Sequence, residues 1–161
     1  GKIFFDVHTL SRGLNENMIR EFRKIPDINK WFNSIDILQA NENETLTFFN
    51  SKNEDEIVEE VLNHNVKIFL ITKGNKGVRL FTKVNNEIIS LYEEGIKVEV
   101  KNKVGCGDIL GSIFFYYYLK DKNLEKALKL ANIAAGISVS YFQLDELNKL
   151  KNDIFTRYNQ K

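Results

Sequence analysis

The sequence has a single cysteine, a single proline and only two histidines among its 161 residues. One cysteine excludes an intrachain disulfide and a cysteine-based metal cluster, and two histidines far apart, His8 and His64, argue against a zinc site. No charge of one sign dominates, because 23 basic and 22 acidic residues give a net charge of +1. A dedicated nucleic-acid binder concentrates excess basic charge on one face, so this composition argues against that class.

The sequence also lacks an apolar run long enough to span a bilayer and a charged-then-apolar secretory leader. We therefore expect no membrane partner and a cytoplasmic location. The 43% hydrophobic content and the length fit one globular domain, residues 1–161. An apolar, strand-like run begins almost at once, at Ile3–Phe5, so we expect the chain to be a fragment of a longer protein.

Strand-like and helix-like segments alternate along the chain. Apolar and β-branched runs predict strands at residues 3–5, 35–38, 66–71, 78–82, 87–92 and 96–100. Helical spacing predicts helices at residues 15–24, 55–64, 107–119 and 144–158, and one more after a cap at Asn123. This order indicates an α/β fold with a mostly parallel sheet flanked by helices.

Polar motifs follow several of the predicted strands. They are Asp6, the pair Asn41 and Glu44, the pair Thr72 and Gly74, and the loop after Val100. Ligands of parallel α/β sheets bind outside the carboxyl ends of the strands, so we expect these residues to share one site. Two simpler interpretations stand beside this one. Asn41 and Glu44 also fit the cap of a helix, and His8, with no partner evident in the sequence, is interpreted as polar surface.

The main chemical signal is Gly105-Cys106-Gly107-Asp108, directly before an apolar helix. Two glycines around a small residue allow a tight turn that points backbone N–H groups one way, at the positive end of the helix dipole. Such a turn suits phosphate oxygens, or the charge that develops during phosphoryl transfer. An aspartate at this place is suited to accept a proton from a substrate hydroxyl. Taken alone, the segment fits an ordinary glycine turn equally well.

The surroundings of this turn resemble a known family. Residues 102–108, the apolar helix and the later segment Leu130-Ala131-Asn132-Ile133-Ala134-Ala135 are similar to the C-terminal signature of PfkB-type carbohydrate kinases. Residues 41–44 resemble the Asn-x-x-Glu motif of that family, and residues 72–77 its Thr-x-Gly-x-x-Gly turn. Asp6 with Arg12 is similar to its strand–Asp–loop–Arg segment. The resemblance covers nearly the whole chain, but only the C-terminal, nucleotide-binding half of a full-length member.

The resemblance implies a ribokinase-like fold and ATP-dependent phosphorylation of a hydroxyl on a sugar or a related small molecule. Asp108 would be the general base, and the backbone of Gly105, Cys106 and Gly107 would form the anion hole for the transferred phosphoryl group. ATP would bind together with Mg²⁺. Asn41 and Glu44 would organise the ion and the phosphates, with Glu44 acting through water. The phosphate and ribose side of the nucleotide would be lined by Thr72, Gly74 and Gly77. Asn132 would lie near the adenine.

Some residues depart from the family pattern. Asn102 and Lys103 stand where many members have an aspartate and a threonine that help to bind a monovalent cation, so we do not expect potassium activation. Cys106 replaces the usual alanine and is interpreted as a small filler rather than a reactive thiol.

Other interpretations of the sequence stay open. The family holds its acceptor mainly through an N-terminal half and a β-sheet lid, so no residue here identifies the acceptor. We expect that missing half, or a second copy of the chain, to cover an exposed face, and we expect little kinase activity from the isolated chain. The alternative function is a non-catalytic nucleotide-binding or interaction module. A dinucleotide-binding Rossmann domain is disfavoured, because no Gly-x-Gly-x-x-Gly follows the first strand.

Overall fold

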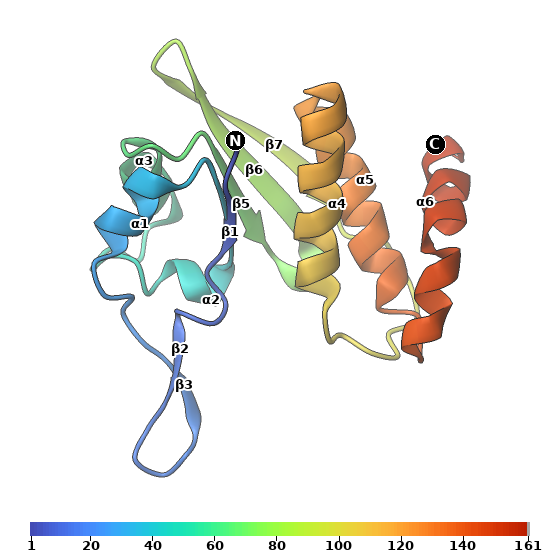
Figure 1. Cartoon of the computed structure of the whole chain (residues 1–161), viewed down its shortest axis with the longest axis horizontal. Coiled ribbons are helices and arrows are strands. Elements are labelled where there is room, and N and C mark those ends of the chain that lie inside the picture. Colours follow the sequence, from blue (N-terminus) through green and yellow to red (C-terminus); the bar gives the residue numbers. More distant parts are fainter. Residues whose placement is uncertain (161) are drawn as a thin grey trace. The chain divides into compact units, whose positions relative to one another are not determined.

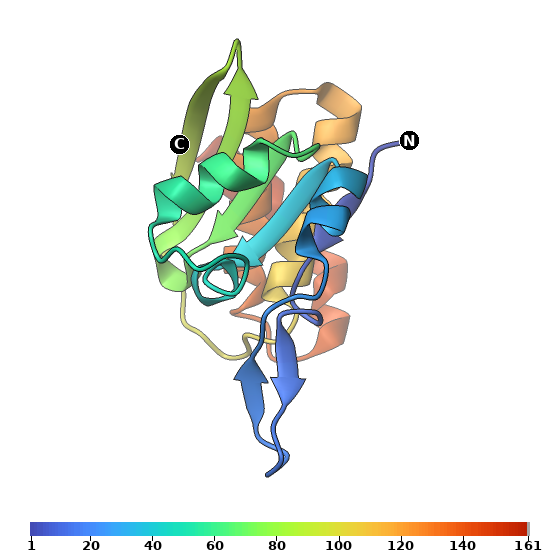
Figure 2. The same ribbon diagram turned by 90° about the vertical axis from the view of Figure 1, so that its left-hand side faces the viewer.

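A computed structural model describes residues 1–160 (Figure 1, Figure 2). The chain divides into two compact units, each assembled from two stretches of sequence. Unit 1 comprises residues 1–73 and 79–91, and unit 2 comprises residues 74–78 and the chain from Tyr92 onward. No helix within residues 1–160 is both long and apolar enough to cross a membrane.

The central sheet has five strands in the order β1-β4-β5-β6-β7. Its strands are β1 (Phe4–Asp6), β4 (Ile37–Asn41), β5 (Ile68–Thr72), β6 (Gly77–Val84) and β7 (Glu87–Glu94). The first three run parallel, with Ile37 of β4 opposite both Phe4 and Ile68. β6 and β7 are joined at Asn85 and Asn86, whose positive φ angles of 49° and 65° suit a two-residue hairpin turn. The expected α/β fold with a mostly parallel sheet is confirmed.

Unit 1 has one main hydrophobic core, to which α1 (Ile28–Ser34), α3 (Glu54–Leu62) and strands β4 and β5 contribute. Fully buried members include Phe32, Leu38, Ile57, Val61 and Phe69. α3 is amphipathic and begins at a cap in which the Asn53 side chain accepts a hydrogen bond from the Asp55 N–H. The short α2 (Glu42–Thr45) follows β4 directly.

The helix predicted at residues 15–24 is wrong. This segment belongs to a two-stranded antiparallel sheet of β2 (Arg12–Leu14) and β3 (Arg20–Phe22), which extends away from the rest of unit 1 in both views (Figure 1, Figure 2). The Asn15 side chain accepts hydrogen bonds from the N–H groups of Asn17 and Ile19, and Met18 adopts a φ of 60°. These local bonds close a turn in place of a helix.

Unit 2 contains η1 (Gly74–Lys76), α4 (Cys106–Asp121), α5 (Leu124–Ser138), the 3₁₀ segment η2 (Leu144–Lys149) and α6 (Leu150–Asn159). The cap predicted at Asn123 is confirmed, because its side chain accepts a hydrogen bond from the Lys126 N–H. Buried residues of α5 and α6, among them Leu130, Ile133 and Ile154, form the core of this unit.

The strand predicted at residues 96–100 is also wrong, because these residues form no regular element. Ile96 instead lies against α5, so close that a Cβ atom added at Gly136 would be 2.2 Å from its Cγ1 atom. The chain then bonds to the end of α5, where the Val139 carbonyl accepts from the N–H groups of Lys101 and Asn102. A tertiary contact therefore decides the path of this apolar segment.

Candidate functional site

Three of the predicted site residues end neighbouring parallel strands of unit 1. Asp6 is the last residue of β1, Asn41 of β4 and Thr72 of β5. In the pairing register Asp6 lies opposite Gln39, and Asn41 lies opposite Thr72. The sequence therefore correctly placed these polar residues at one edge of the sheet.

Asn41 and Glu44 form a capping box at the start of α2. The Asn41 side-chain oxygen accepts hydrogen bonds from the N–H groups of Asn43 at 3.0 Å and Glu44 at 2.9 Å. In return, the Glu44 Oε2 atom accepts from the Asn41 N–H at 2.9 Å. The capping interpretation is thus confirmed, and the cap also fixes the Glu44 carboxylate at the end of β4.

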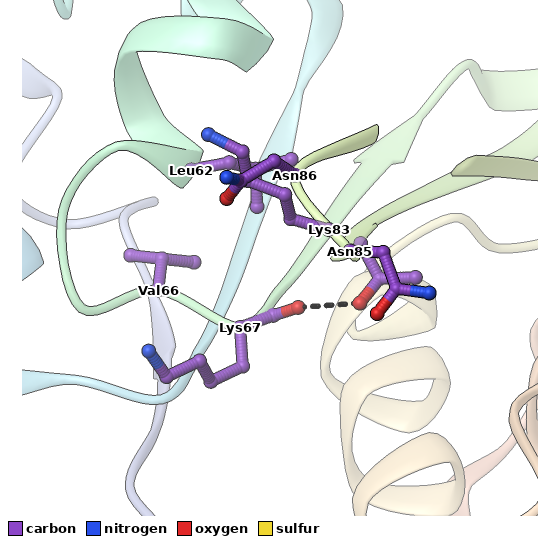
Figure 3. A pocket seen from close by; sticks show the side chains of 7 residues that line it. Leu62, Val66, Lys67, Lys83, Asn85 and Asn86 are labelled. Atoms are coloured by element: carbon purple, nitrogen blue, oxygen red, sulfur yellow. Dashed lines mark hydrogen bonds between the residues drawn. The ribbon is translucent and has the colours of Figure 1, made fainter. Parts of the chain in front are cut away.

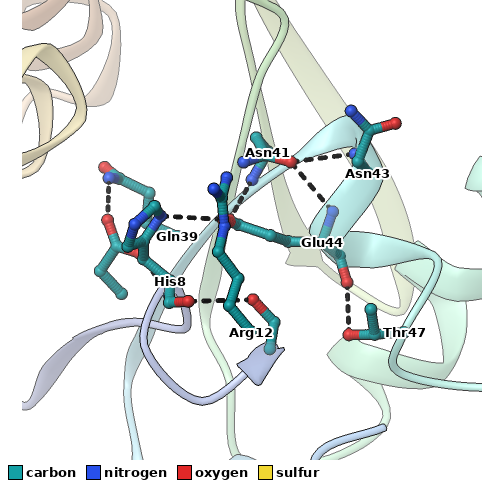
Figure 4. A network of polar contacts seen from close by, with 9 residues as sticks. His8, Arg12, Gln39, Asn41, Asn43, Glu44 and Thr47 are labelled. Atoms are coloured by element: carbon teal, nitrogen blue, oxygen red, sulfur yellow. Dashed lines mark hydrogen bonds and ion pairs between the residues drawn. The ribbon is translucent and has the colours of Figure 1, made fainter. Parts of the chain in front are cut away.

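The other oxygen of Glu44 faces the loop after β1 (Figure 4). Its Oε1 atom lies 3.0 Å from His8 Nδ1 and 3.5 Å from Arg12 Nη2. The Glu44 side chain is only 2% exposed, so it is a buried carboxylate with two basic neighbours. His8 is exposed, as interpreted from the sequence, but its ring has a partner in Glu44. The sequence held no signal for this contact, because the two residues are 36 positions apart.

Asp6 takes part in the same cluster. One of its carboxylate oxygens accepts from the His8 N–H at 2.9 Å, and the other accepts from the Gln39 side chain at 2.5 Å. Burial raises the pKa of Asp6, and the nearby charge of Glu44 adds to this, while the two hydrogen bonds oppose it. Gln39 was missed because a glutamine inside a buried strand resembles a structural residue.

Magnesium is expected to reach Glu44 through water. Both oxygens of this carboxylate already accept N–H donors, and their remaining lone-pair capacity suits a further donor such as a metal-bound water. Across the described part of the chain, no group of three or more His, Cys, Asp or Glu residues is placed to hold a metal ion. A contact through water is compatible with these bonds.

The turn that follows Thr72 is tied to both nearby helices of unit 1. Lys73 Nζ lies 2.6 Å from Glu54 Oε2 and 3.5 Å from Glu42 Oε1. Arg79 Nη1 lies 2.5 Å from the other oxygen of Glu54. These ion pairs occupy the Lys73 ammonium and fix the end of β5 against the first turns of α2 and α3.

Two glycines of the predicted nucleotide turn lie in unit 2, where they serve different purposes. Gly74 has a φ of 58°, and a Cβ atom added there would meet nothing within 4 Å. Gly77 has a φ of 113°, and a Cβ atom there would lie 2.0 Å from the Glu93 carbonyl oxygen. The close approach of the β7 backbone therefore accounts for a glycine at position 77 without a ligand. At Gly74 the space beside the Cα atom is open.

The predicted glycine bend forms the start of α4. Gly105 is the N-cap with a φ of 80°, Cys106 and Gly107 open the helix, and the Gly105 carbonyl accepts from the Ile109 N–H at 2.9 Å. Asp108 lies exposed in the first turn. Burial raises the pKa of the Cys106 thiol, which supports its interpretation as a small filler.

Asn132, predicted near the adenine, is a buried residue of α5. Its side-chain amide donates a hydrogen bond of 2.8 Å to the Glu94 carbonyl at the end of β7. This bond holds α5 to the strand. The position of Asn132 near an adenine stays a prediction.

The predicted residues thus form two groups. Asp6, Asn41, Glu44 and Thr72 lie in unit 1. The others lie in unit 2, namely Gly74, Gly77, Gly105, Cys106, Gly107, Asp108 and Asn132. A single site formed by both groups stays a prediction.

A cavity of unit 1 lies away from the predicted residues of that unit. It has a volume of about 490 Å³ and is lined by Leu62, Val66, Lys67, Thr82, Lys83, Asn85 and Asn86 (Figure 3). Two of the lining residues are joined, because the Thr82 hydroxyl donates to the Lys67 carbonyl at 2.8 Å. Lys67 directly precedes β5, whereas Thr72 ends that strand, so the cavity lies at the opposite end of β5 from the predicted residues.

Known proteins similar to this chain are kinases. A 5-dehydro-2-deoxygluconokinase of Listeria innocua serovar 6a is 30% identical over 88 residues, which are 55% of this chain and 26% of that protein. A ribokinase of Arabidopsis thaliana, solved with ribose and ATP, matches 95% of this chain and 47% of its own, with a TM-score of 0.75 and 23% identity. A pyrophosphate-dependent kinase in the ribokinase family, solved with sulfate, matches 92% of this chain and 52% of its own, with a TM-score of 0.77 and 18% identity.

These matches span about half of the solved chains and a quarter of the curated relative. At this identity the solved structures show the fold, which is that of the ribokinases, as expected. The family model described as pfkB family carbohydrate kinase matches residues 11–149. The chain therefore belongs to the pfkB family of carbohydrate kinases.

Proposed function

We propose that the chain is the nucleotide-binding, catalytic-base half of a kinase that transfers phosphate from ATP to a hydroxyl of a sugar or a related small molecule. The observation that carries this proposal is the start of α4, where the positive-φ Gly105 turns the backbone and Asp108 lies exposed in the first turn. Family membership supports it, as does the similarity to a ribokinase that was solved with ATP bound.

In the proposed reaction Asp108 takes the proton of the acceptor hydroxyl. The hydroxyl oxygen forms a bond to the γ-phosphorus, the bond from that phosphorus to the bridging oxygen breaks, and ADP leaves with the electron pair. The N–H groups of Gly105, Cys106 and Gly107, at the positive end of the α4 dipole, stabilise the charge on the transferred group. Positioning and charge stabilisation supply most of the rate in such transfers.

Asn41, Thr72 and Gly74 are proposed to line the phosphates of ATP. Mg²⁺, when bound with ATP, would neutralise phosphate charge, and Glu44 would reach it through water. Asn132 and Gly77 contribute by holding β7 and α5 in place rather than by contact, since both are accounted for by bonds and packing within unit 2.

The acceptor is proposed to bind residues outside this chain, in the remainder of the protein or in a second copy of it. The relative named 5-dehydro-2-deoxygluconokinase supports a sugar-derived acceptor. By this proposal the isolated chain binds nucleotide and has little activity of its own.

The test is Asp108→Asn in the full-length protein, with the exposed Asp145→Asn as the matched control in the same unit. Loss of a general base should lower kcat by about 10²-fold to 10⁴-fold. ATP binding, measured by calorimetry, should be retained, and Asp145→Asn should match the parent protein. Unchanged turnover in Asp108→Asn would remove Asp108 from the mechanism.

A non-catalytic nucleotide-binding module is the second candidate. It is favoured by Asn102 and Lys103, which stand where many members of the family have an aspartate and a threonine. Such a module would bind ATP equally well with and without Mg²⁺, and its full-length form would show no ATP-dependent phosphorylation of any sugar.

A further inference from the structure

The buried carboxylate of Glu44 holds two basic side chains at the ends of β1 and β4. His8 Nδ1 and Arg12 Nη2 both approach its Oε1 atom, at 3.0 Å and 3.5 Å. The Glu44 Oε2 atom is held in turn by the Asn41 N–H. Because the carboxylate is fixed by α2, it fixes the two basic side chains as well (Figure 4).

Each basic side chain keeps unused hydrogen-bonding groups. Arg12 Nε is buried and has no hydrogen-bond partner, and the guanidinium lies over the Phe22 ring, 5.2 Å from its centroid. His8 is 53% exposed, and within residues 1–160 its Nε2 atom, across the ring from Glu44, makes no hydrogen bond. The buried Nε atom is not reached by a ligand in this arrangement, but the Arg12 side chain is 34% exposed, and its guanidinium carries further N–H donors for an oxygen ligand.

The N–H donors of the cluster, rather than its net charge, favour oxygen atoms as ligands. The positive charge of Arg12 offsets that of Glu44, and this buried carboxylate orients the two donors. Asp6 is occupied by the His8 N–H and the Gln39 amide. Guanidinium groups match phosphate oxygens in geometry and in charge.

We infer that His8 and Arg12, positioned by Glu44, bind phosphate oxygens of the phosphoryl donor. The inference rests on the proposed function and adds two binding residues and a positioning residue to it. The shared ligand chemistry is a polyphosphate, which could come from ATP or from inorganic pyrophosphate, the donor of one structurally similar kinase. Glu44 then acts through the two basic side chains.

The first experiment is chemical modification of histidine by diethyl pyrocarbonate, read by peptide mass spectrometry on the 161-residue chain. His64 is the internal reference, because its side chain is 17% exposed and its Nδ1 atom lies 3.0 Å from the Asn33 side-chain oxygen. His8 should react faster than His64. Saturating ATP or pyrophosphate should slow the reaction of His8 at least about fivefold, whereas adenosine should not, because only a phosphate occupies Nε2.

The second experiment measures binding of ATP and of pyrophosphate by calorimetry. His8→Ala and Arg12→Ala should each weaken binding of the true donor about tenfold, since each removes a hydrogen bond to a charged group. His64→Gln is the control for loss of an imidazole. Arg20→Ala is the control for loss of a positive charge, because Arg20 lies on β3, the strand that also carries Phe22. Thermal melts monitored by circular dichroism show whether each variant is folded.

Three outcomes decide the inference. Protection of His8 with loss of affinity in both variants supports it, and the ligand that protects at the lower concentration identifies the donor. Binding of a polyphosphate with an unprotected His8 and unchanged variants refutes it and leaves the proposed function standing. No binding of either polyphosphate by the folded chain overturns the proposed nucleotide-binding function and this inference together.

Discussion

Replacing Gly77 by alanine should destabilise unit 2 far more than replacing Gly74. Both glycines have positive φ, 113° and 58°, so each alanine variant carries backbone strain. Their surroundings differ, because a Cβ atom at Gly77 would lie 2.0 Å from the Glu93 carbonyl oxygen, while one at Gly74 would meet nothing within 4 Å. Gly74→Ala therefore serves as the control for strain alone.

The structure sets the size of the difference. A left-handed backbone costs an alanine about 1–2 kcal/mol at Gly74, and the cost is at least as large at Gly77, whose φ of 113° lies beyond the left-handed region. In Gly77→Ala the end of β7 must also retreat by about 1.4 Å to restore an ordinary contact of 3.4 Å. That movement breaks the hydrogen bonds that Lys76 O accepts from the Gly95 N–H and the Tyr92 hydroxyl. At about 1 kcal/mol for each bond, Gly77→Ala should lose about 3–4 kcal/mol.

Urea unfolding of the parent chain and both variants gives the free energies of unfolding. An equal loss in the two variants would show that the β7 backbone does not require a glycine at position 77. The packing explanation for Gly77 would then be refuted, and a ligand-binding role for this glycine would regain support.

Three further predictions concern other parts of the chain. Asn123→Ala should lose about 1 kcal/mol of unfolding free energy, since it removes the cap on the Lys126 N–H. Iodoacetamide should alkylate Cys106 more slowly than free glutathione at neutral pH, because burial raises the pKa of its thiol and lowers the thiolate fraction. The hydrogen bond from Lys2, with that from the Ile3 N–H, lowers the pKa of Asp36 below its usual 3.8. Asp36→Asn should therefore destabilise the fold near neutral pH, and the difference should vanish as the pH falls below 3.8 through the folded pKa.

Each of these predictions has a clear contrary result. Urea midpoints of Asn123→Ala and the parent that coincide would contradict the cap. Alkylation of Cys106 at the rate of glutathione or faster, followed by intact mass, would show a reactive thiol. A destabilisation of Asp36→Asn that persists unchanged in acid-titrated thermal melts would mean that the Asp36 charge is not its cause.

Local chemistry explains what could be predicted from the sequence. The bend at Gly105 was predictable, because the glycine permits the positive φ that the turn adopts. The strand-end positions of Asn41 and Thr72 followed from apolar runs that end in polar residues. The cap at Asn123 is likewise a local pattern.

The errors arose where side-chain bonds or distant contacts decide the structure. Met18 and Ile19 have helical spacing, yet both are exposed, and the Asn15 side chain closes a turn instead. Ile96 alternates with polar neighbours as in a strand, but its contact with Gly136, 40 residues later, holds it elsewhere. The pairing of His8 with Glu44 is equally non-local and left no pattern to recognise.

The division of the chain into two interleaved units has a consequence for its synthesis. Residues 74–78 belong to unit 2 but precede residues 79–91, which unit 1 needs. During synthesis, unit 1 therefore cannot be completed until residue 91 has left the ribosome. Residues 74–78 leave the ribosome before the rest of unit 2 has been made. Each unit is built from two separate stretches of sequence, so no single truncation of the chain yields one whole unit without part of the other.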